Sequence, residues 1–139
     1  MLCPYHKPEE DSRMRILLAD DYPEVRSALR LLLEQEPIQA TVTEVSDTQE
    51  LLATLGQDCP TIVLLDWELP GLHTEDRMRT MRASCPNLKV IALSSKLEVR
   101  QEALAAGADA FVCKAEPPEQ ILSALRSLAV QLDNYQFHH

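Results

Sequence analysis

The chain has 139 residues, of which 45% are apolar and 25% charged, and its formal net charge at pH 7 is −9. This length and composition are typical of one soluble globular domain. No apolar run approaches the roughly 20 residues that cross a bilayer, and the first ten residues lack the apolar segment of a secretory signal. We therefore expect a cytoplasmic protein without membrane contact. Because so acidic a domain is repelled by a phosphate backbone, we expect no direct binding of nucleic acid by this chain.

The cysteines and glycines exclude several kinds of site. The four cysteines lie far apart and form no C-x-x-C pair or zinc pattern, which predicts free thiols, mostly buried, in a reducing compartment: Cys3, Cys59, Cys85 and Cys113. Only three glycines occur, and neither G-x-G-x-x-G nor a P-loop can be written with them. A glycine loop that holds nucleotide phosphates is therefore excluded.

Short apolar runs alternate along the chain with segments of helical periodicity. Residues 1–13 are polar and contain proline, which favours a disordered N-terminal extension. Strands are then predicted at 15–19, 40–45, 62–66, 88–93 and 110–113, and helices at 23–35, 47–55, 74–84, 97–106 and from 117 onward. Asp47 with Glu50 resembles a capping box, and we expect Gly56 to end the helix that it opens.

This order of elements predicts an α/β fold. Five strands alternating with five helices give a flavodoxin-like, doubly wound, five-stranded parallel sheet with the strand order 2-1-3-4-5. The domain would span 14–134 and leave 135–139 as a C-terminal tail. In this order the polar residues that follow the strands share one edge of the sheet: Asp20, Asp21, Asp66, Ser94, Ser95 and Lys114.

The residues at that edge predict a particular chemistry. Three carboxylates close together repel one another by about 1 to 4 kcal/mol per pair, so the cluster calls for a cation. Their ligand atoms are hard oxygens, which favours Mg²⁺. Lys114 adds a positive charge and Ser94 a hydroxyl donor, and such groups around one carboxylate suit phosphoryl transfer. Asp66 would then be a nucleophile that forms an acyl phosphate.

At this point the sequence resembles the receiver domains of two-component response regulators. The resemblance covers about Arg15 to Leu132 and rests on four segments in order, each following a strand or containing one: Asp20-Asp21, Asp66-Trp67-Glu68-Leu69-Pro70-Gly71, Ser94-Ser95 and Gly107-Ala108-Asp109-Ala110-Phe111-Val112-Cys113-Lys114. Each segment alone is a weak signal. Together, at the right strand ends, they identify the family.

The resemblance implies a role for each matching residue. Asp66 would accept a phosphoryl group from a phosphohistidine of a sensor histidine kinase. The Mg²⁺ ligands would be Asp21, Asp66 and the backbone carbonyl of Glu68, with Asp20 acting through water. Lys114 would pair with a phosphoryl oxygen, and Ser94 would be the switch hydroxyl. Phe111 matches the aromatic that turns inward when Ser94 moves, although plain packing remains the alternative for Phe111 and for Trp67.

The same resemblance implies how the signal would leave the domain. Phosphorylation would remodel the face formed by the helix at 97–106, the strand at 110–113 and the last helix, and that face would bind a partner or a second copy in a homodimer. The Lys-x-x-x-Pro ending at Lys114 is similar to receivers that precede a LuxR-type helix-turn-helix domain. The output would be such a domain, absent from this chain, or direct contact with a partner.

Two residues depart from the usual family pattern. Ala115 follows Lys114 where many members have proline, and since a cis bond before a non-proline residue costs about 3 kcal/mol, we expect a trans bond. Glu68 is acidic and faces the site, and we hypothesise that it tunes the lifetime of the acyl phosphate.

Two other functions are alternatives to the phosphorylation switch. A phosphatase of the haloacid dehalogenase type would have Asp at the position of Glu68 and a cap insertion, and the sequence has neither. A degenerate receiver that serves only as a docking module would be expected to lack site residues, whereas all of them are present here. We expect a phosphorylation switch rather than a turnover enzyme.

Overall fold

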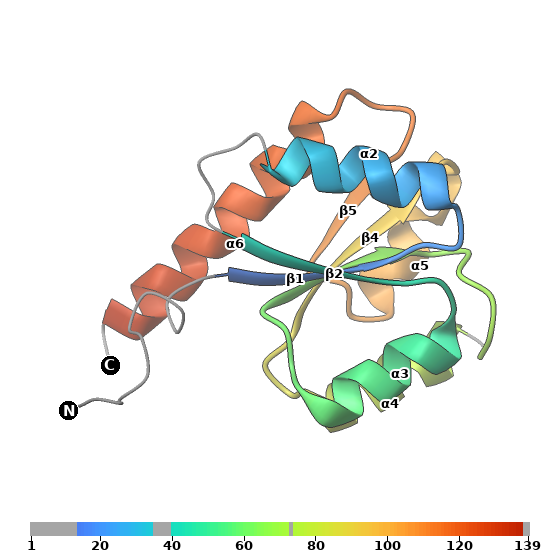
Figure 1. Ribbon diagram of the computed structural model, residues 1–139, viewed down its shortest axis with the longest axis horizontal. Coiled ribbons are helices and arrows are strands. Elements are labelled where there is room, and N and C mark those ends of the chain that lie inside the picture. Colours follow the sequence, from blue (N-terminus) through green and yellow to red (C-terminus); the bar gives the residue numbers. More distant parts are fainter. Residues whose placement is uncertain (1–13, 35–39, 73, 138–139) are drawn as a thin grey trace.

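The structure, a computed structural model, describes residues 14–34, 40–72 and 74–137. The N-terminal extension expected at 1–13 lies outside these residues. One parallel sheet has the order β2-β1-β3-β4-β5, as predicted (Figure 1). Its strands are β1 (Met14–Ala19), β2 (Ala40–Val45), β3 (Ile62–Asp66), β4 (Lys89–Ser94) and β5 (Ala110–Cys113).

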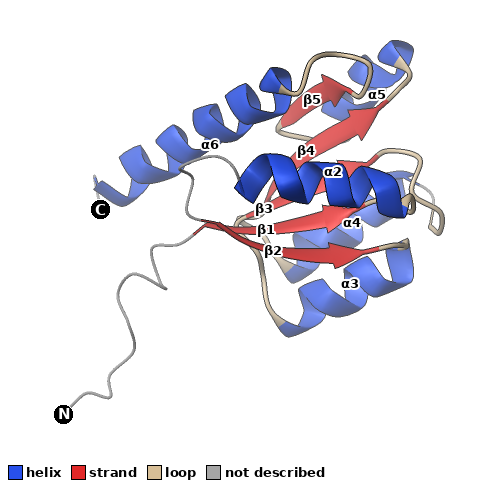
Figure 2. Cartoon of the chain, turned by 45° about the horizontal axis from the view of Figure 1, so that its top comes forward, coloured by secondary structure: helices blue, strands red, loops and turns tan. Residues whose placement is uncertain are grey.

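Helices connect the strands and cover both faces of the sheet (Figure 2). They are α2 (Pro23–Glu34), α3 (Thr48–Gln57), α4 (Thr74–Ser84), the 3₁₀ turn η1 (Leu97–Val99), α5 (Arg100–Ala105) and α6 (Glu119–Phe137). The helix expected at 97–106 is thus divided into η1 and the short α5. The last helix begins at Glu119, two residues after Pro117, and runs on to Phe137. None of the described helices is long and apolar enough to span a membrane.

Two hydrophobic cores lie on opposite faces of the sheet. One packs α2 and α6 against the strands through residues such as Leu29 and Leu125. The other packs α3, α4 and α5 through Leu51, Met81 and Ala103. Successive residues of a strand point alternately into the two cores, so each inner strand is buried on both sides. This explains why β1 and β3 are apolar without alternation.

The start of α3 follows the sequence prediction, and its end does not. The Asp47 side chain accepts a hydrogen bond from the Glu50 backbone N–H at 2.8 Å, and the Glu50 carboxylate accepts one from the Ser46 backbone at 2.7 Å. The prediction that Gly56 ends the helix is wrong, because α3 runs to Gln57. Gly56 keeps a negative φ, whereas a glycine that stops a helix adopts a positive one.

The prediction of free thiols is wrong for two cysteines. Cys59 and Cys85 form a disulfide, with their Cα atoms 5.7 Å apart. Cys59 precedes β3, and Cys85 follows α4, which returns the chain to the end of the sheet where β3 begins. The β3–α4 crossover therefore brings together residues that are 26 positions apart. Cys113 is a buried free thiol, as expected, and Cys3 lies outside the described residues.

Candidate functional site

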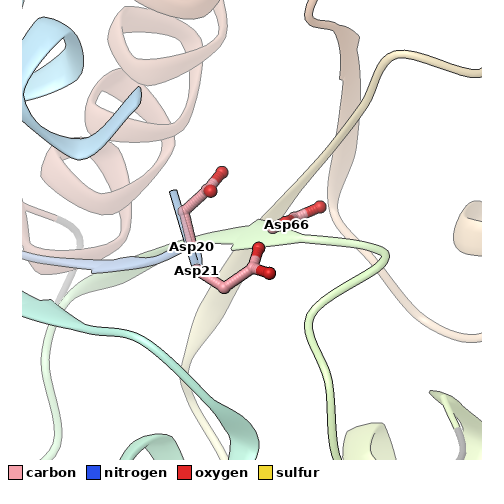
Figure 3. Close-up of side chains that lie close together, drawn as sticks. All are labelled: Asp20, Asp21 and Asp66. Atoms are coloured by element: carbon pink, nitrogen blue, oxygen red, sulfur yellow. The ribbon is translucent and has the colours of Figure 1, made fainter. Parts of the chain in front are cut away.

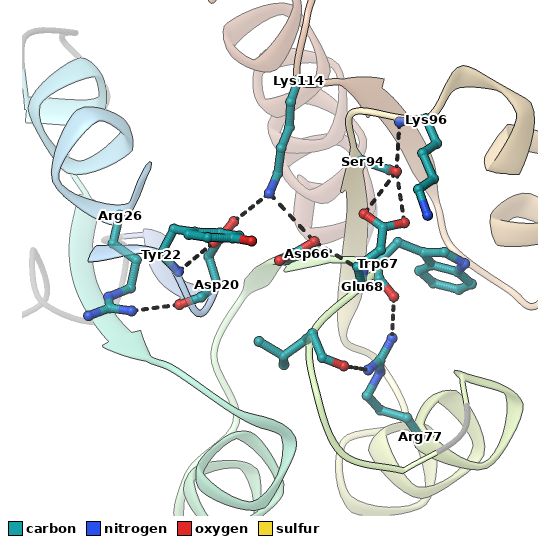
Figure 4. A network of polar contacts seen from close by, with 11 residues as sticks. Asp20, Tyr22, Arg26, Asp66, Trp67, Glu68, Arg77, Ser94, Lys96 and Lys114 are labelled. Atoms are coloured by element: carbon teal, nitrogen blue, oxygen red, sulfur yellow. Dashed lines mark hydrogen bonds and ion pairs between the residues drawn. The ribbon is translucent and has the colours of Figure 1, made fainter. Parts of the chain in front are cut away.

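The predicted site residues converge at the carboxyl edge of the sheet. Asp20 directly follows β1, Asp66 and Ser94 end β3 and β4, and Lys114 directly follows β5. Because β1, β3, β4 and β5 are consecutive neighbours in the sheet, these residues from four parts of the chain become neighbours. Figure 4 shows their side chains around Asp66.

Three carboxylates form the acidic part of the site. One oxygen each of Asp20, Asp21 and Asp66 lies within 4.8 Å of the others (Figure 3). Asp20 and Asp66 are each 1% exposed, whereas Asp21 is open to solvent. Anionic oxygens this close, with one of them reachable from solvent, form a donor set that fits a hard divalent cation such as Mg²⁺.

Lys114 supplies the positive charge nearest to these carboxylates. Its Nζ lies 2.8 Å from Asp20 Oδ2 and 3.5 Å from Asp66 Oδ1. Burial alone lowers the pKa of Lys114, but the hydrogen bond to Asp20 and the charges of Asp66 and Asp20 raise it above its usual value. The lysine is therefore held in its charged form. The bond from Lys114 to Ala115 is trans, as expected, since the described residues contain no cis peptide bond.

The surroundings of Asp66 disfavour its charged form. Its burial raises the pKa of its carboxyl to about 6, with Lys114 opposing this rise and Asp20 adding to it. The backbone N–H of Glu68 donates to Asp66 Oδ1 at 3.0 Å and so fixes the carboxylate relative to the following loop. The nearby positive charge does not fully offset the cost of burying this charged carboxylate. A bound cation, or conversion of the carboxylate to another group, would lower that cost.

Ser94 contacts Glu68 instead of Asp66. Its fully buried hydroxyl lies 3.0 and 2.9 Å from Glu68 Oε1 and Oε2, and it accepts a hydrogen bond from the Lys96 backbone at 3.0 Å. The Glu68 side chain thus faces the site, as the sequence predicted. The predicted switch hydroxyl is engaged by this carboxylate.

The ring of Phe111 is already inside the protein. It is 7% exposed, belongs to the core under α5, and lies 5.8 Å from the guanidinium carbon of Arg100. Packing accounts for its burial, and the cation–π contact links it to α5.

Arg77 and the contact that Trp67 makes were missed by the sequence analysis. The Trp67 indole N–H donates to the Glu102 carboxylate of α5 at 3.1 Å. Arg77 of α4 is fully buried and contacts the loop after Asp66. A signal for Arg77 did exist. It stands next to Met78 and four residues before Met81, so it lies on the buried face of its helix.

The protein has the CheY-like flavodoxin fold, with an acidic edge on its sheet. Residues 16–126 match the family described as "Response regulator receiver domain". The chain belongs to this family.

Individual relatives agree with the family match. The Transcriptional activator protein ExaE of Pseudomonas putida is 34% identical over 115 residues, covering 81% of this chain and 54% of the relative. A LuxR-family response regulator from Aurantimonas sp. SI85-9A1 superposes with a TM-score of 0.77 at 28% identity, covering 86% of each chain. TrrA of Thermotoga maritima, solved in complex with Mg(2+)-BeF, has a TM-score of 0.73 at 24% identity, covering 83% of this chain and 98% of TrrA. The chain spans about half the length of the curated relatives it matches.

Proposed function

We propose that this chain accepts a phosphoryl group on Asp66 from a phosphohistidine of a sensor histidine kinase in the cytoplasm. A carboxylate oxygen of Asp66 attacks the phosphorus, the phosphorus–nitrogen bond breaks, and the histidine keeps the electron pair of that bond. The convergence of Asp20, Asp21, Asp66 and Lys114 at one sheet edge carries this proposal. Lys114 Nζ, already close to Asp66, would pair with a phosphoryl oxygen and offset the charge that the reaction adds.

The acidic cluster would hold Mg²⁺. Asp21 and Asp66 would bind the ion directly, with the backbone carbonyl of Glu68, and Asp20 would act through water. Bound there, the ion would neutralise charge on the phosphoryl oxygens during transfer. The chain's own contribution is the prior placement of the carboxylates, for which Tyr22 N–H donates to Asp20 Oδ1 at 2.9 Å.

The acyl phosphate would act as a switch. Ser94 would leave Glu68 for a phosphoryl oxygen, and Phe111, through its contact with Arg100, would pass the change to the face made of α5, β5 and α6. That face would then control a partner, a second copy in a homodimer, or a DNA-binding output domain in a longer protein. The domain would promote its own phosphorylation and dephosphorylation without being a turnover enzyme, and would not bind nucleic acid itself.

Incubation with Mg²⁺ and acetyl phosphate, followed by intact-mass measurement, tests the proposal. We expect the wild-type chain to gain the mass of one phosphoryl group, and Asp66→Asn to gain none. Lys114→Ala should gain it slowly while its Asp66 remains. No gain in the wild type would favour the docking module instead, and an equal gain in Asp66→Asn would move the phosphorylation to another residue.

A further inference from the structure

Arg77 is a buried charge that the hydrophobic core does not explain. Its side chain is 0% exposed and is the largest fully buried one in the described part of the chain. It forms no ion pair with any carboxylate that the structure describes, and its Nε has no hydrogen-bond partner. Burying a guanidinium costs free energy that an apolar residue of similar size would not cost. The charges of Asp66 and Glu68 favour the guanidinium without pairing with it, and its direct polar contacts are the hydrogen bonds that it makes.

Two of those hydrogen bonds hold the loop that follows Asp66, and a third reaches Thr48 Oγ1 of α3 at 3.4 Å. Arg77 Nη1 donates to the backbone carbonyl of Leu69 at 2.9 Å, and Nη2 donates to that of Trp67 at 3.1 Å. In Figure 4, dashed lines join the Arg77 guanidinium to these two carbonyl oxygens. The guanidinium carbon also lies 5.8 Å from the centre of the Trp67 ring. The Arg77 side chain thus binds two backbone carbonyls of the loop, one on each side of Glu68.

The backbone carbonyls of this loop differ in whether they accept a hydrogen bond. The carbonyls before and after that of Glu68 are held by Arg77. Those of Asp66 and Pro70 accept backbone N–H groups, at 3.0 Å in both cases. Buried carbonyls are normally paired, whereas Glu68 is exposed, so a carbonyl there that accepts no protein donor is open to solvent or to a ligand. The Glu68 carbonyl accepts no hydrogen bond from any residue that the structure describes.

We propose that Arg77 is a positioning residue for the cation site: by holding the carbonyls of Trp67 and Leu69, it fixes the loop so that the Glu68 carbonyl stays available to Mg²⁺. Arg77 acts through the backbone and does not touch the ion. The inference rests on the metal site of the proposed function and adds a residue that lies outside the carboxylate cluster and outside the strand ends.

Arginine suits this task better than other residues. Its planar guanidinium has donors on separate nitrogens, so it can bond two carbonyls at once in a fixed geometry. Lysine would keep the charge but present its donors from one nitrogen. Methionine would fill the space and provide no donor. These differences give graded variants at one position.

The test compares Arg77→Met, Arg77→Lys and Met81→Ala with the wild-type chain. Met81 is fully buried on the same helix and makes no contact of this kind with the loop, so its loss lowers stability without releasing the carbonyls. The dissociation constant for Mg²⁺ is measured by titration calorimetry with magnesium chloride, at a temperature where circular dichroism shows each variant folded. Partners that orient metal ligands typically contribute 10- to 100-fold in affinity.

We expect Arg77→Met to weaken Mg²⁺ binding by about 10- to 100-fold, Arg77→Lys to lie between it and the wild type, and Met81→Ala to stay within about twofold. Wild-type affinity in folded Arg77→Met, or an equal loss in Met81→Ala, would overturn the inference. Should Arg77→Met fail to fold, wild-type affinity in Arg77→Lys would overturn it instead. A wild-type chain that binds Mg²⁺ but is not labelled by acetyl phosphate would defeat the proposed function alone, whereas a labelled wild type with unchanged Arg77 variants would defeat this inference alone.

Discussion

The hydroxyl of Ser94 is hydrogen-bonded to the carboxylate of Glu68, at 2.9 Å from its nearer oxygen. Ser94 ends the strand beside that of Asp66, and its hydroxyl is the group proposed to bind the phosphoryl oxygen. Glu68 and a phosphoryl group would therefore compete for one donor. Glu68 thus stabilises the unphosphorylated arrangement through its side chain. The same residue provides a proposed metal ligand through its backbone carbonyl.

Glu68→Ala should speed the labelling of Asp66. The substitution frees the Ser94 hydroxyl and removes a negative charge beside the incoming phosphate, and a hydrogen bond worth about 1 kcal/mol corresponds to about fivefold in rate. The rate is measured by intact mass against time with acetyl phosphate. Glu68→Gln is the matched control, because it keeps an acceptor for Ser94 and loses the charge. Rates equal to wild type in both variants would show that the contact does not restrain Ser94.

The lifetime of the acyl phosphate should also depend on Glu68. After removal of the phosphodonor, loss of the added mass is followed in wild type, Glu68→Ala and Glu68→Gln. A side chain that faces the site alters the approach of water to the phosphorus, so we expect different half-lives. Equal half-lives in all three would end the hypothesis that Glu68 tunes this step.

Asp66→Asn should be more stable than wild type at neutral pH without Mg²⁺. The native pKa of about 6 lies above the usual 3.8, so the folded chain keeps a proton that the unfolded chain releases between these values. The contribution of Asp66 to the stability of wild type therefore falls as pH rises from about 4 through about 6. The whole gap corresponds to about 3 kcal/mol, and we expect Asn to recover about 1 to 3 kcal/mol of it.

Urea unfolding of both proteins between pH 4 and 7 checks this expectation. The pH dependence that the two chains share cancels in the difference between their free energies of unfolding, so this difference is the quantity to compare. It should be near zero at pH 4 and reach its full size above pH 6. A difference that stays constant across this range would contradict a raised pKa of Asp66.

The arrangement of the strands could be predicted because each strand is marked by a local pattern of apolar residues. β1 and β3 are buried on both faces, so their apolar runs are continuous, and the polar residue that ends each run marks the sheet edge. From the strand order the positions of Asp20, Asp66 and Lys114 followed directly. Their convergence needed no knowledge of side-chain conformation.

The contacts that could not be predicted depend on which way a side chain turns after the chain has folded. Nothing in the spacing of Glu68 and Ser94 shows that they form a hydrogen bond. The spacing of Arg77 from Met81 indicates a buried position, but nothing in it shows that the side chain binds two carbonyls of the loop after Asp66. The pairing of Cys59 with Cys85 likewise depends on the path of a crossover, which brings two distant loops together.

Gly71→Ala and Gly56→Ala should change stability in opposite directions. Gly71 has a φ of +129°, and a Cβ there would overlap the side chain of Thr48. Strain of this kind costs about 1 to 3 kcal/mol before the clash is counted. Gly56 lies inside α3 with nothing within 4 Å of an added Cβ, so alanine should raise the free energy of unfolding by about 0.5 to 1 kcal/mol. Urea unfolding of the two variants measures both effects. A Gly71→Ala variant more stable than wild type would show that the loop after Asp66 rearranges at little cost to accept the added Cβ.

Reduction of the Cys59–Cys85 disulfide should lower the free energy of unfolding without unfolding the site. The bond closes a loop of 26 positions that contains all of β3 and α4, and the chain-entropy estimate for a loop of this length is about 3.5 kcal/mol. Urea unfolding with and without a reductant measures the difference in wild type. Cys59→Ala should already show the lower value in the absence of reductant and should not respond to it. Cys113→Ala is the matched control, since it removes a buried free thiol and should keep the full response. A reductant effect that persists in Cys59→Ala would assign the stabilisation to something other than this disulfide.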